Sequence, residues 1–249
     1  MNLHRLAQRF AAVADVYERG RPEYPPAVAG ALAAEFGLRS GAVVLDLGAG
    51  TGKLSTALVA AGLDVVAVEP LASLRELLAA KIGAEHVRDG VAEAIPLGDA
   101  SVDAVTIADA FHWFDQPRAL EEIGRVLRPG GGMAVLSVVP DWSGASWAHE
   151  LGTLVMRSRP EHPHFDGPGW QQAVRAAGVF TTPREVRVTI SQPVRTEQIA
   201  DHLGSMSWIA AMPDDERVAM LETIRTLIAE GQTPAELPVH FVIGMTALA

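Results

Sequence analysis

Residues 43–55 combine an apolar run, an acid and three alternate glycines, a pattern suited to binding a nucleotide-like cofactor. The run Val-Val-Leu-Asp-Leu leads into Gly48, Gly50 and Gly52 and then into a predicted helix, and Asp46 lies inside the predicted strand. A strand that reverses into a helix around a ligand needs backbone torsions and a close approach that a Cβ would forbid, and glycine permits both. The chemistry predicted here is therefore cofactor binding.

The spacing fits neither of the two common phosphate-binding turns. A P-loop needs a glycine at the position of Leu47 and a Ser or Thr at the position of Leu54. A dinucleotide turn needs a third glycine where this chain has Lys53. ATP, GTP and NAD are therefore disfavoured as the ligand.

The turn resembles the first motif of the class I S-adenosylmethionine (SAM)-dependent methyltransferases, hydrophobic-hydrophobic-Asp-x-Gly-x-Gly-x-Gly. The resemblance implies that the glycine turn makes room for the methionine portion of SAM. It also implies that Asp46 holds the amino group of the cofactor, directly or through water. S-adenosylhomocysteine (SAH) would be the product.

Two further segments match the same family. Glu69 and Pro70 follow a second predicted strand, and an acid at a strand tip about twenty residues after the turn is placed to accept hydrogen bonds from both ribose hydroxyls. The stretch 90–96, Gly-Val-Ala-Glu-Ala-Ile-Pro, resembles the loop that packs against adenine. Val91 stands where many relatives carry Asp, so we carry over only Ala92 and Glu93 as cofactor contacts, largely through their backbone.

The tip of a strand predicted over 101–108 carries several candidates. In doubly wound sheets the ligand lies outside the carboxyl ends of the strands. The tip residues Asp109, Ala110 and Phe111 are expected to face the cofactor, and His112 and Trp113 follow them. After a helix predicted over about 116–127, Arg-Val-Leu-Arg-Pro-Gly-Gly-Gly and a strand over 133–138 resemble a family signature. Core packing is the alternative explanation for each ring.

The N-terminal segment resembles the cap of a methyltransferase subgroup that includes trans-aconitate-type enzymes. Its pattern is Tyr-x-x-x-Arg-Pro-x-Tyr-Pro, after an amphipathic helix predicted from about Leu3. The resemblance implies that Tyr17 and Arg21 contact the cofactor, and a bidentate guanidinium suits the methionine carboxylate. A surface salt bridge is the alternative role for Arg21.

The implied reaction is a direct SN2 transfer of the sulfonium methyl group to an O, N or other nucleophile of a small-molecule acceptor. If the acceptor must lose a proton, His112 is the first candidate general base, because imidazole titrates near neutrality, and His240 is the second. A carboxylate acceptor would need no base. The tryptophans expected on the acceptor side, each with core packing as the alternative, are Trp113, Trp142, Trp147 and Trp208.

Composition limits the partners. Thirty acidic against 20 basic residues give a formal charge of −10, which disfavours a nucleic-acid-binding face. The chain has no cysteine, no secretory h-region and no stretch as long as a membrane span, so we expect a cytoplasmic protein without disulfides. The His-x-His-x-Asp spacing at 162–166 could present metal ligands in an extended segment, but a proline-rich surface loop is the favoured reading, and no metal is expected.

Periodicity predicts one domain of 249 residues with an α/β, Rossmann-like fold. Residues 1–39 are predicted to form cap helices and 41–139 the alternating strands and helices of a cofactor-binding parallel core. Residues 140–249 are predicted to give an acceptor-side insertion with one helix, two helices over 196–230 and a final pair of strands, closing a seven-stranded, mostly parallel sheet. Two functional alternatives stay open: a non-catalytic SAM- or nucleotide-binding module, and a less favoured NAD(P)-dependent oxidoreductase.

Overall fold

The computed structural model describes residues 3–141, 146–193, 195–231 and 236–249. These residues form a seven-stranded sheet of order β3-β2-β1-β4-β5-β7-β6. The pairs β1–β2, β1–β4, β2–β3 and β4–β5 are parallel. The strands are β1 Val43–Leu47, β2 Asp64–Val68, β3 Val87–Arg88, β4 Val102–Ala108, β5 Leu127–Pro140, β6 Arg184–Pro193 and β7 Glu236–Ala247.

Helices connect most of the strands. The α-helices are α1 Ala14–Gly20, α2 Pro26–Phe36, α3 Lys53–Ala60, α4 Ala72–Ile82, α5 Gln116–Val126, α6 Ser146–Arg157, α7 Pro163–Asp166, α8 Trp170–Ala177, α9 Thr196–Gly204, α10 Ser207–Ala210 and α11 Asp214–Glu230. The described residues also form the 3-10 helices η1 Ala7–Val13, η2 Ala84–His86 and η3 Phe111–Trp113.

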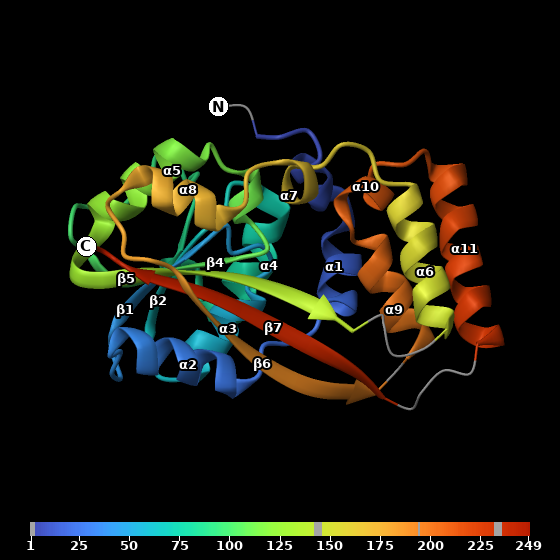
Figure 1. Cartoon of the computed structure of the whole chain (residues 1–249), viewed down its shortest axis with the longest axis horizontal. Coiled ribbons are helices and arrows are strands. Elements are labelled where there is room, and N and C mark those ends of the chain that lie inside the picture. Colours follow the sequence, from blue (N-terminus) through green and yellow to red (C-terminus); the bar gives the residue numbers. More distant parts are fainter. Residues whose placement is uncertain (1–2, 142–145, 194, 232–235) are drawn as a thin grey trace. The chain divides into compact units, whose positions relative to one another are not determined.

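The centre of the sheet is apolar because both of its faces are covered. Leu45 of β1 lies opposite Val66 of β2 and Val105 of β4. Figure 1 shows α2 and α3 on one face of these strands and α5 and α8 on the other. The sequences of parallel strands that are buried on both faces are nearly continuous apolar runs, and this explains the mostly apolar run at 43–47. The prediction of a seven-stranded, mostly parallel sheet with the last two strands at one edge is confirmed.

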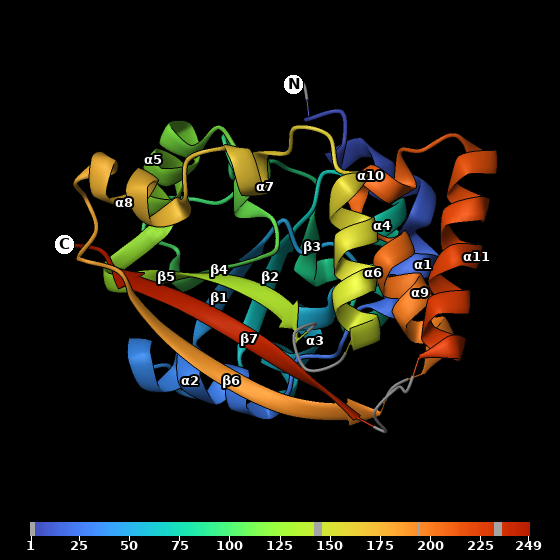
Figure 2. The same ribbon diagram turned by 45° about the vertical axis from the view of Figure 1, so that its right-hand side comes forward.

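The chain divides into two compact units. Unit 1 comprises residues 1–22, 139–162 and 189–240, and unit 2 comprises residues 23–138, 163–188 and 241–249. In unit 1 the helices α6, α9 and α11 run side by side in both views (Figures 1 and 2). Their shared core is helical and contains Leu151, Ile199, Leu203 and Ile224.

Several predicted boundaries differ from the structure. The helix predicted from about Leu3 begins at Ala7 as a 3-10 turn and becomes α-helical only at Ala14. The region 140–169 holds α6 and α7 rather than one helix, and 196–230 holds three helices rather than two. These errors involve four-residue helices, which are too short to show a helical period.

The glycines after α5 were expected to precede a strand over 133–138, but β5 already begins at Leu127. A Cβ added at Gly131 would lie 2.7 Å from the carbonyl oxygen of Asp103, and a Cβ added at Gly132 would lie 2.5 Å from Phe36 Cε1. Glycine therefore allows this stretch to run directly along β4, with a register shift between Val102 and Ala104.

Candidate functional site

The glycine turn after β1 packs tightly at its two ends and is open in its middle. All three glycines have positive φ, and a Cβ at Gly48 would lie 2.8 Å from Ala110 Cβ. A Cβ at Gly52 would lie 2.5 Å from Leu78 Cδ1, whereas nothing lies within 4 Å of a Cβ built on Gly50. The backbone at Gly50 therefore borders a space that a ligand can approach closely.

A buried hydroxyl lies in the same turn. The Thr51 side chain is 1% exposed, and within the described part of the chain its Oγ1 has no hydrogen-bond partner. A buried polar atom without a partner is rare and calls for an explanation such as a bound group. Thr51 is a feature that the sequence analysis did not single out.

Asp46 of β1 is a buried acid held by two hydroxyls. Ser55 of α3 donates to Oδ2 over 2.6 Å, and Thr106 of β4 donates to Oδ1 over 3.3 Å. Burial raises the pKa of the Asp46 carboxyl to about 6, although the bonds from Ser55 and Thr106 oppose the shift. These two hydroxyl partners were not predicted, because the packing of three separate elements brings them together.

Glu69, at the tip of β2, is joined to the glycine turn. The Gly50 N–H donates to Glu69 Oε2 and the Leu71 N–H to Oε1, each over 2.9 Å. Burial raises the pKa of Glu69, against the effect of these two bonds and of the nearby Arg75. Arg75 also donates to the carbonyl oxygens of Glu69 and Pro70. The strand tip predicted to meet the ribose is therefore a fixed, acidic and largely dry corner.

The loop predicted to meet adenine closes on itself through a bridge between Val91 and Ala94. Ala92 is buried, and the Glu93 carboxylate accepts a 2.7 Å hydrogen bond from the Asp115 N–H at the start of α5. In this structure the Glu93 side chain fixes a helix start, so any cofactor contact would fall to its backbone, as the sequence analysis expected.

The tip of β4 adjoins the turn. Asp109 has a φ of 50°, a left-handed conformation that non-glycine residues adopt seldom and that occurs often at functional sites. Ala110 lies against Gly48, and Phe111 is buried with its ring 5.9 Å from that of Phe114. The structure thus places Ala110 of the β4 tip against the glycine turn within unit 2.

His112 lies among aromatic rings at the same tip. Its ring centroid is 4.5 Å from that of Trp113 and 5.0 Å from that of His164 in α7. The contact between His112 and His164 was not predicted. His164 belongs to the His-x-His-x-Asp spacing, and the expectation of a surface loop there is wrong: residues 163–166 form a short helix, and His162 is buried against Ser207 and Trp208.

Tyr17, Arg21 and His240 lie in unit 1. The Arg21 guanidinium lies 5.1 Å from the centroid of the Tyr17 ring, and its Nε donates to Ser205. His240 Nδ1 is 2.9 Å from Thr189 Oγ1, and its Nε2 is 4.0 Å from Asp141 Oδ2.

Trp208 is a buried member of the helical core of unit 1, and its indole N–H donates to the Val155 carbonyl. Trp113 packs against the core of unit 2. Trp142 lies outside the described residues, and Trp147 falls in α6 with its side chain undescribed.

Lys53 gives a further reason against a phosphate ligand. In a P-loop the corresponding lysine reaches the phosphates. Here Lys53 begins α3, is buried, and forms an ion pair with Glu23. Two buried carboxylates, Asp46 and Glu69, add negative charge beside the turn. The arrangement suits a ligand with hydrogen-bond donors and positive charge.

The described residues limit the chemistry in two respects. No group of three or more His, Asp or Glu side chains is placed to hold a metal ion in residues 3–141, 146–193, 195–231 and 236–249. No helix within those ranges is both long and apolar enough to cross a membrane.

Comparison with known proteins gives consistent matches. A family model described as a methyltransferase domain matches residues 45–135. The chain is 39% identical to an uncharacterized methyltransferase of Mycobacterium tuberculosis strain H37Rv over 224 residues, which cover 90% of this chain and 87% of the relative. It is 32% identical to an uncharacterized methyltransferase-like protein of Schizosaccharomyces pombe over 206 residues, which cover 82% of this chain and 79% of the relative.

Solved structures share the fold. A protein of Anaeromyxobacter dehalogenans described as a candidate type II methyltransferase matches with a TM-score of 0.63 and 26% identity, covering 91% of this chain and 97% of that one.

Proposed function

The chain belongs to the class I methyltransferase family, and on that premise we propose that it transfers the methyl group of SAM to a small-molecule acceptor and releases SAH. The observation that carries the proposal is the open turn at Gly50, whose N–H is bonded to the buried Glu69. A turn that packs closely at Gly48 and Gly52 but leaves Gly50 bordering open space suits a ligand that approaches the backbone.

Electrostatics support a cationic cofactor in this place. Burial raises the pKa of both Asp46 and Glu69, which means that the unliganded site holds ionised carboxylates at a cost. A ligand with an ammonium and a sulfonium group would lower that cost by Coulombic attraction. SAM, when bound, supplies an electrophilic methyl group on its sulfonium.

Each element of unit 2 would then have a defined task. Asp46 would orient the amino group of the cofactor and Glu69, beside Pro70, the ribose hydroxyls, since a carboxylate oxygen that accepts one N–H retains a further lone pair. Ala92 and the backbone of Glu93 would border the adenine. The tip residues Asp109, Ala110 and Phe111 would close the site beside the turn.

Two residues of unit 1 complete the proposed cofactor set on the strength of the sequence pattern alone. These are Tyr17 and Arg21, which contact each other. The guanidinium would suit the methionine carboxylate. All 249 residues would form one methyltransferase domain.

Catalysis would come mainly from holding the acceptor in line with the methyl group and away from water. An acceptor that must lose a proton would transfer it to His112, at the β4 tip, with His240 as the second candidate. Proton transfer by a positioned side chain contributes roughly 10²–10⁴-fold to a rate. No covalent intermediate is required.

The direct test is transfer of label from methyl-tritiated SAM to a set of candidate metabolites, followed by separation of the product. Labelled product would support the enzyme. Binding of SAH without transfer to any acceptor would favour a regulatory SAM-binding module, and calorimetric binding of NAD in place of SAH would favour an oxidoreductase.

A further inference from the structure

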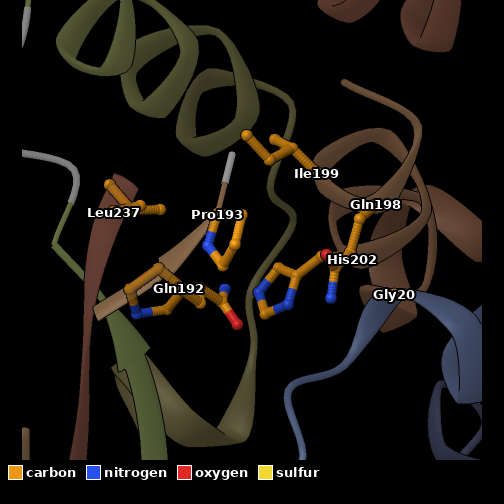
Figure 3. A pocket seen from close by; sticks show the side chains of 8 residues that line it. Gly20, Gln192, Pro193, Gln198, Ile199, His202 and Leu237 are labelled. Atoms are coloured by element: carbon orange, nitrogen blue, oxygen red, sulfur yellow. The ribbon is translucent and has the colours of Figure 1, made fainter. Parts of the chain in front are cut away.

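The hollow at the end of α1 is too small to be an acceptor site. Figure 3 shows it within unit 1, where its lining includes Gln192, His202 and Leu237. It has room for about one water molecule, with a volume of about 10 Å³. A methyl acceptor needs more space than this, and unit 2 offers an aromatic surface beside the glycine turn.

Four rings of unit 2 form this aromatic surface, which comprises His112, Trp113, His164 and Phe165. The ring centroids of His112 and Trp113 are 4.5 Å apart, and those of His112 and His164 are 5.0 Å apart. Those of His164 and Phe165 are 4.6 Å apart. The first two residues belong to η3 and the last two to α7, which packs against η3. Two segments that are distant in the sequence therefore build one continuous aromatic surface.

The aromatic surface begins beside the glycine turn. A Cβ at Gly48 would lie 2.8 Å from Ala110 Cβ and 3.5 Å from Phe114 Cζ. Ala110 and Phe114 flank η3, so both ends of this short helix lie against the turn. His112, in the middle of η3, is therefore within two residues of each contact with the segment proposed to hold the cofactor.

The outer part of the aromatic surface is open to solvent. Phe165 is 45% exposed and His164 is also exposed, whereas His112 and Trp113 are half-buried. Aromatic rings attract one another in offset or edge-to-face arrangements, and each ring that is covered removes a large apolar area from water. A planar ligand would gain both effects here, because the rings of η3 and α7 are already in contact with one another.

The charges near the aromatic surface limit the ligand further. Residues 109–115 and 163–167 include Asp109, Asp115 and Asp166 and contain no Lys or Arg. Asp115 lies 3.9 Å from Arg118, which offsets one of the three charges. An anionic ligand would still meet a net negative charge. A tricarboxylate such as trans-aconitate does not suit this surface, although the N-terminal segment resembles the trans-aconitate-type subgroup.

The imidazole of His112 favours one kind of nucleophile. An imidazole titrates near neutrality, so as a base it accepts weakly acidic protons. A phenolic hydroxyl has a pKa of about 10, whereas an alkyl alcohol holds its proton about as tightly as water, with a pKa of about 16. Proton transfer to His112 is therefore far less unfavourable from a phenol than from an alkyl alcohol.

We propose that the aromatic surface binds an uncharged planar ring and, resting on the proposed function, that this ring is the methyl acceptor and carries a phenolic hydroxyl. The hydroxyl proton would pass to the neutral imidazole of His112. The phenolate oxygen would then bond to the methyl carbon as the carbon–sulfur bond breaks and its electron pair remains on sulfur. His112 would finally release the proton to water.

Phenol and cyclohexanol, which have nearly the same size and one hydroxyl each, test the preference for a planar ring. Binding of each to the full-length protein is followed by NMR from the imidazole signals of His112 and His164. Phenol should shift both signals and bind about twofold to tenfold more tightly than cyclohexanol, the equivalent of one aromatic pair. Benzoate, a planar anion, should bind more weakly than phenol.

Equal or weaker binding of phenol relative to cyclohexanol would overturn the assignment of the aromatic surface. Binding of benzoate as tight as that of phenol, or tighter, would also overturn it.

A pair of variants at Phe165 makes this test specific. Phe165→Leu removes the exposed ring but keeps an apolar side chain, so phenol affinity should fall about twofold to tenfold. Phe165→Tyr keeps the ring and should bind phenol as the wild-type protein does. Val218→Ala, at another exposed apolar residue, in α11, should also leave phenol affinity unchanged. Thermal unfolding confirms that all three variants fold. Unchanged phenol affinity in Phe165→Leu, or an equal loss in Phe165→Tyr, would overturn the assignment.

The acceptor role has its own readout. An acceptor found by label transfer should be a phenol, and Phe165→Leu should raise its KM while SAH affinity stays at the wild-type value. An acceptor without an aromatic ring would overturn the substrate class while leaving the methyltransferase proposal intact. Absence of SAH binding, with phenol still bound at the aromatic surface, would instead refute the proposed function.

Discussion

The Gly50 N–H donates to the Glu69 carboxylate over 2.9 Å, so the turn after β1 and the acid at the tip of β2 form one structure. Glu69 also accepts from the Leu71 N–H, so one side chain fixes two backbone segments. Glu69 therefore has both a preorganising task and a proposed ligand-binding task, which substitutions can separate.

Glu69→Gln should weaken SAH binding by about 1.5–3 kcal/mol, the usual value for a hydrogen bond to a charged group. Glutamine retains one oxygen for a backbone N–H, so the fold should persist. Isothermal titration calorimetry gives the affinity, and Glu85→Gln, a change of a largely exposed carboxylate, is the control. Wild-type affinity in a folded Glu69→Gln protein would make Glu69 purely structural.

Gly50→Ala should abolish most SAH binding, because the added Cβ would fill the space through which the ligand approaches the backbone. Gly37 is a matched control, because it also has positive φ and nothing within 4 Å of a built Cβ, but ends α2. Each substitution should cost about 1–2 kcal/mol of folding free energy, since both place alanine in a left-handed conformation. SAH affinity should fall at least about tenfold only in Gly50→Ala; equal affinity in the two variants would contradict the open turn.

Asp46→Asn should stabilise the unliganded protein at pH 7.5 while weakening SAH binding. The folded-state pKa of Asp46 is about 6 against an ordinary 3.8, so its stabilising, protonated form is fully present below about pH 4 and lost as the pH rises through 6. That difference in pKa corresponds to roughly 3 kcal/mol of folding free energy at most. Urea unfolding from pH 4 to 7.5 should show the advantage of Asn shrinking as the pH falls.

Asp103→Asn is the control of opposite sign for that measurement. Burial opposes ionisation of Asp103, but hydrogen bonds from Arg128 and Val43 outweigh it and lower its pKa. Its stabilising effect is therefore present above the ordinary pKa and lost as the pH falls. Asp103→Asn should destabilise at pH 7.5, and an Asp46→Asn protein that is also destabilised there would refute the buried-charge account.

His112→Gln should lower kcat by about 10²-fold or more with an acceptor that loses its proton during transfer, with little change in SAH affinity. His240→Gln, which removes the contacts to Thr189 and Asp141, should have a much smaller effect. Rates with the acceptor identified by label transfer decide between the two. A larger loss in His240→Gln would make His240 the base.

The parts of the fold and site that follow from local spacing were predictable. The apolar run, the glycines and the acid after the second strand each define an element by their own sequence, whereas the bond from the Gly50 N–H to Glu69 forms only when β1 and β2 pair. The partners of Asp46 were not predictable, because Ser55 and Thr106 approach it only when α3 and β4 pack against β1. The contact of His164 with His112 likewise depends on a four-residue helix that leaves no periodic signal.

Ligand-dependent thermal unfolding tests the central claim most directly. A ligand that binds only the folded state raises the melting temperature according to its concentration over its Kd. We predict that SAH and SAM raise the melting temperature of the wild-type protein in a concentration-dependent way, that the rise is lost in Gly50→Ala but kept in Gly37→Ala, and that NAD and ATP have no effect. A rise with NAD and none with SAH would contradict the assignment of the turn to SAM.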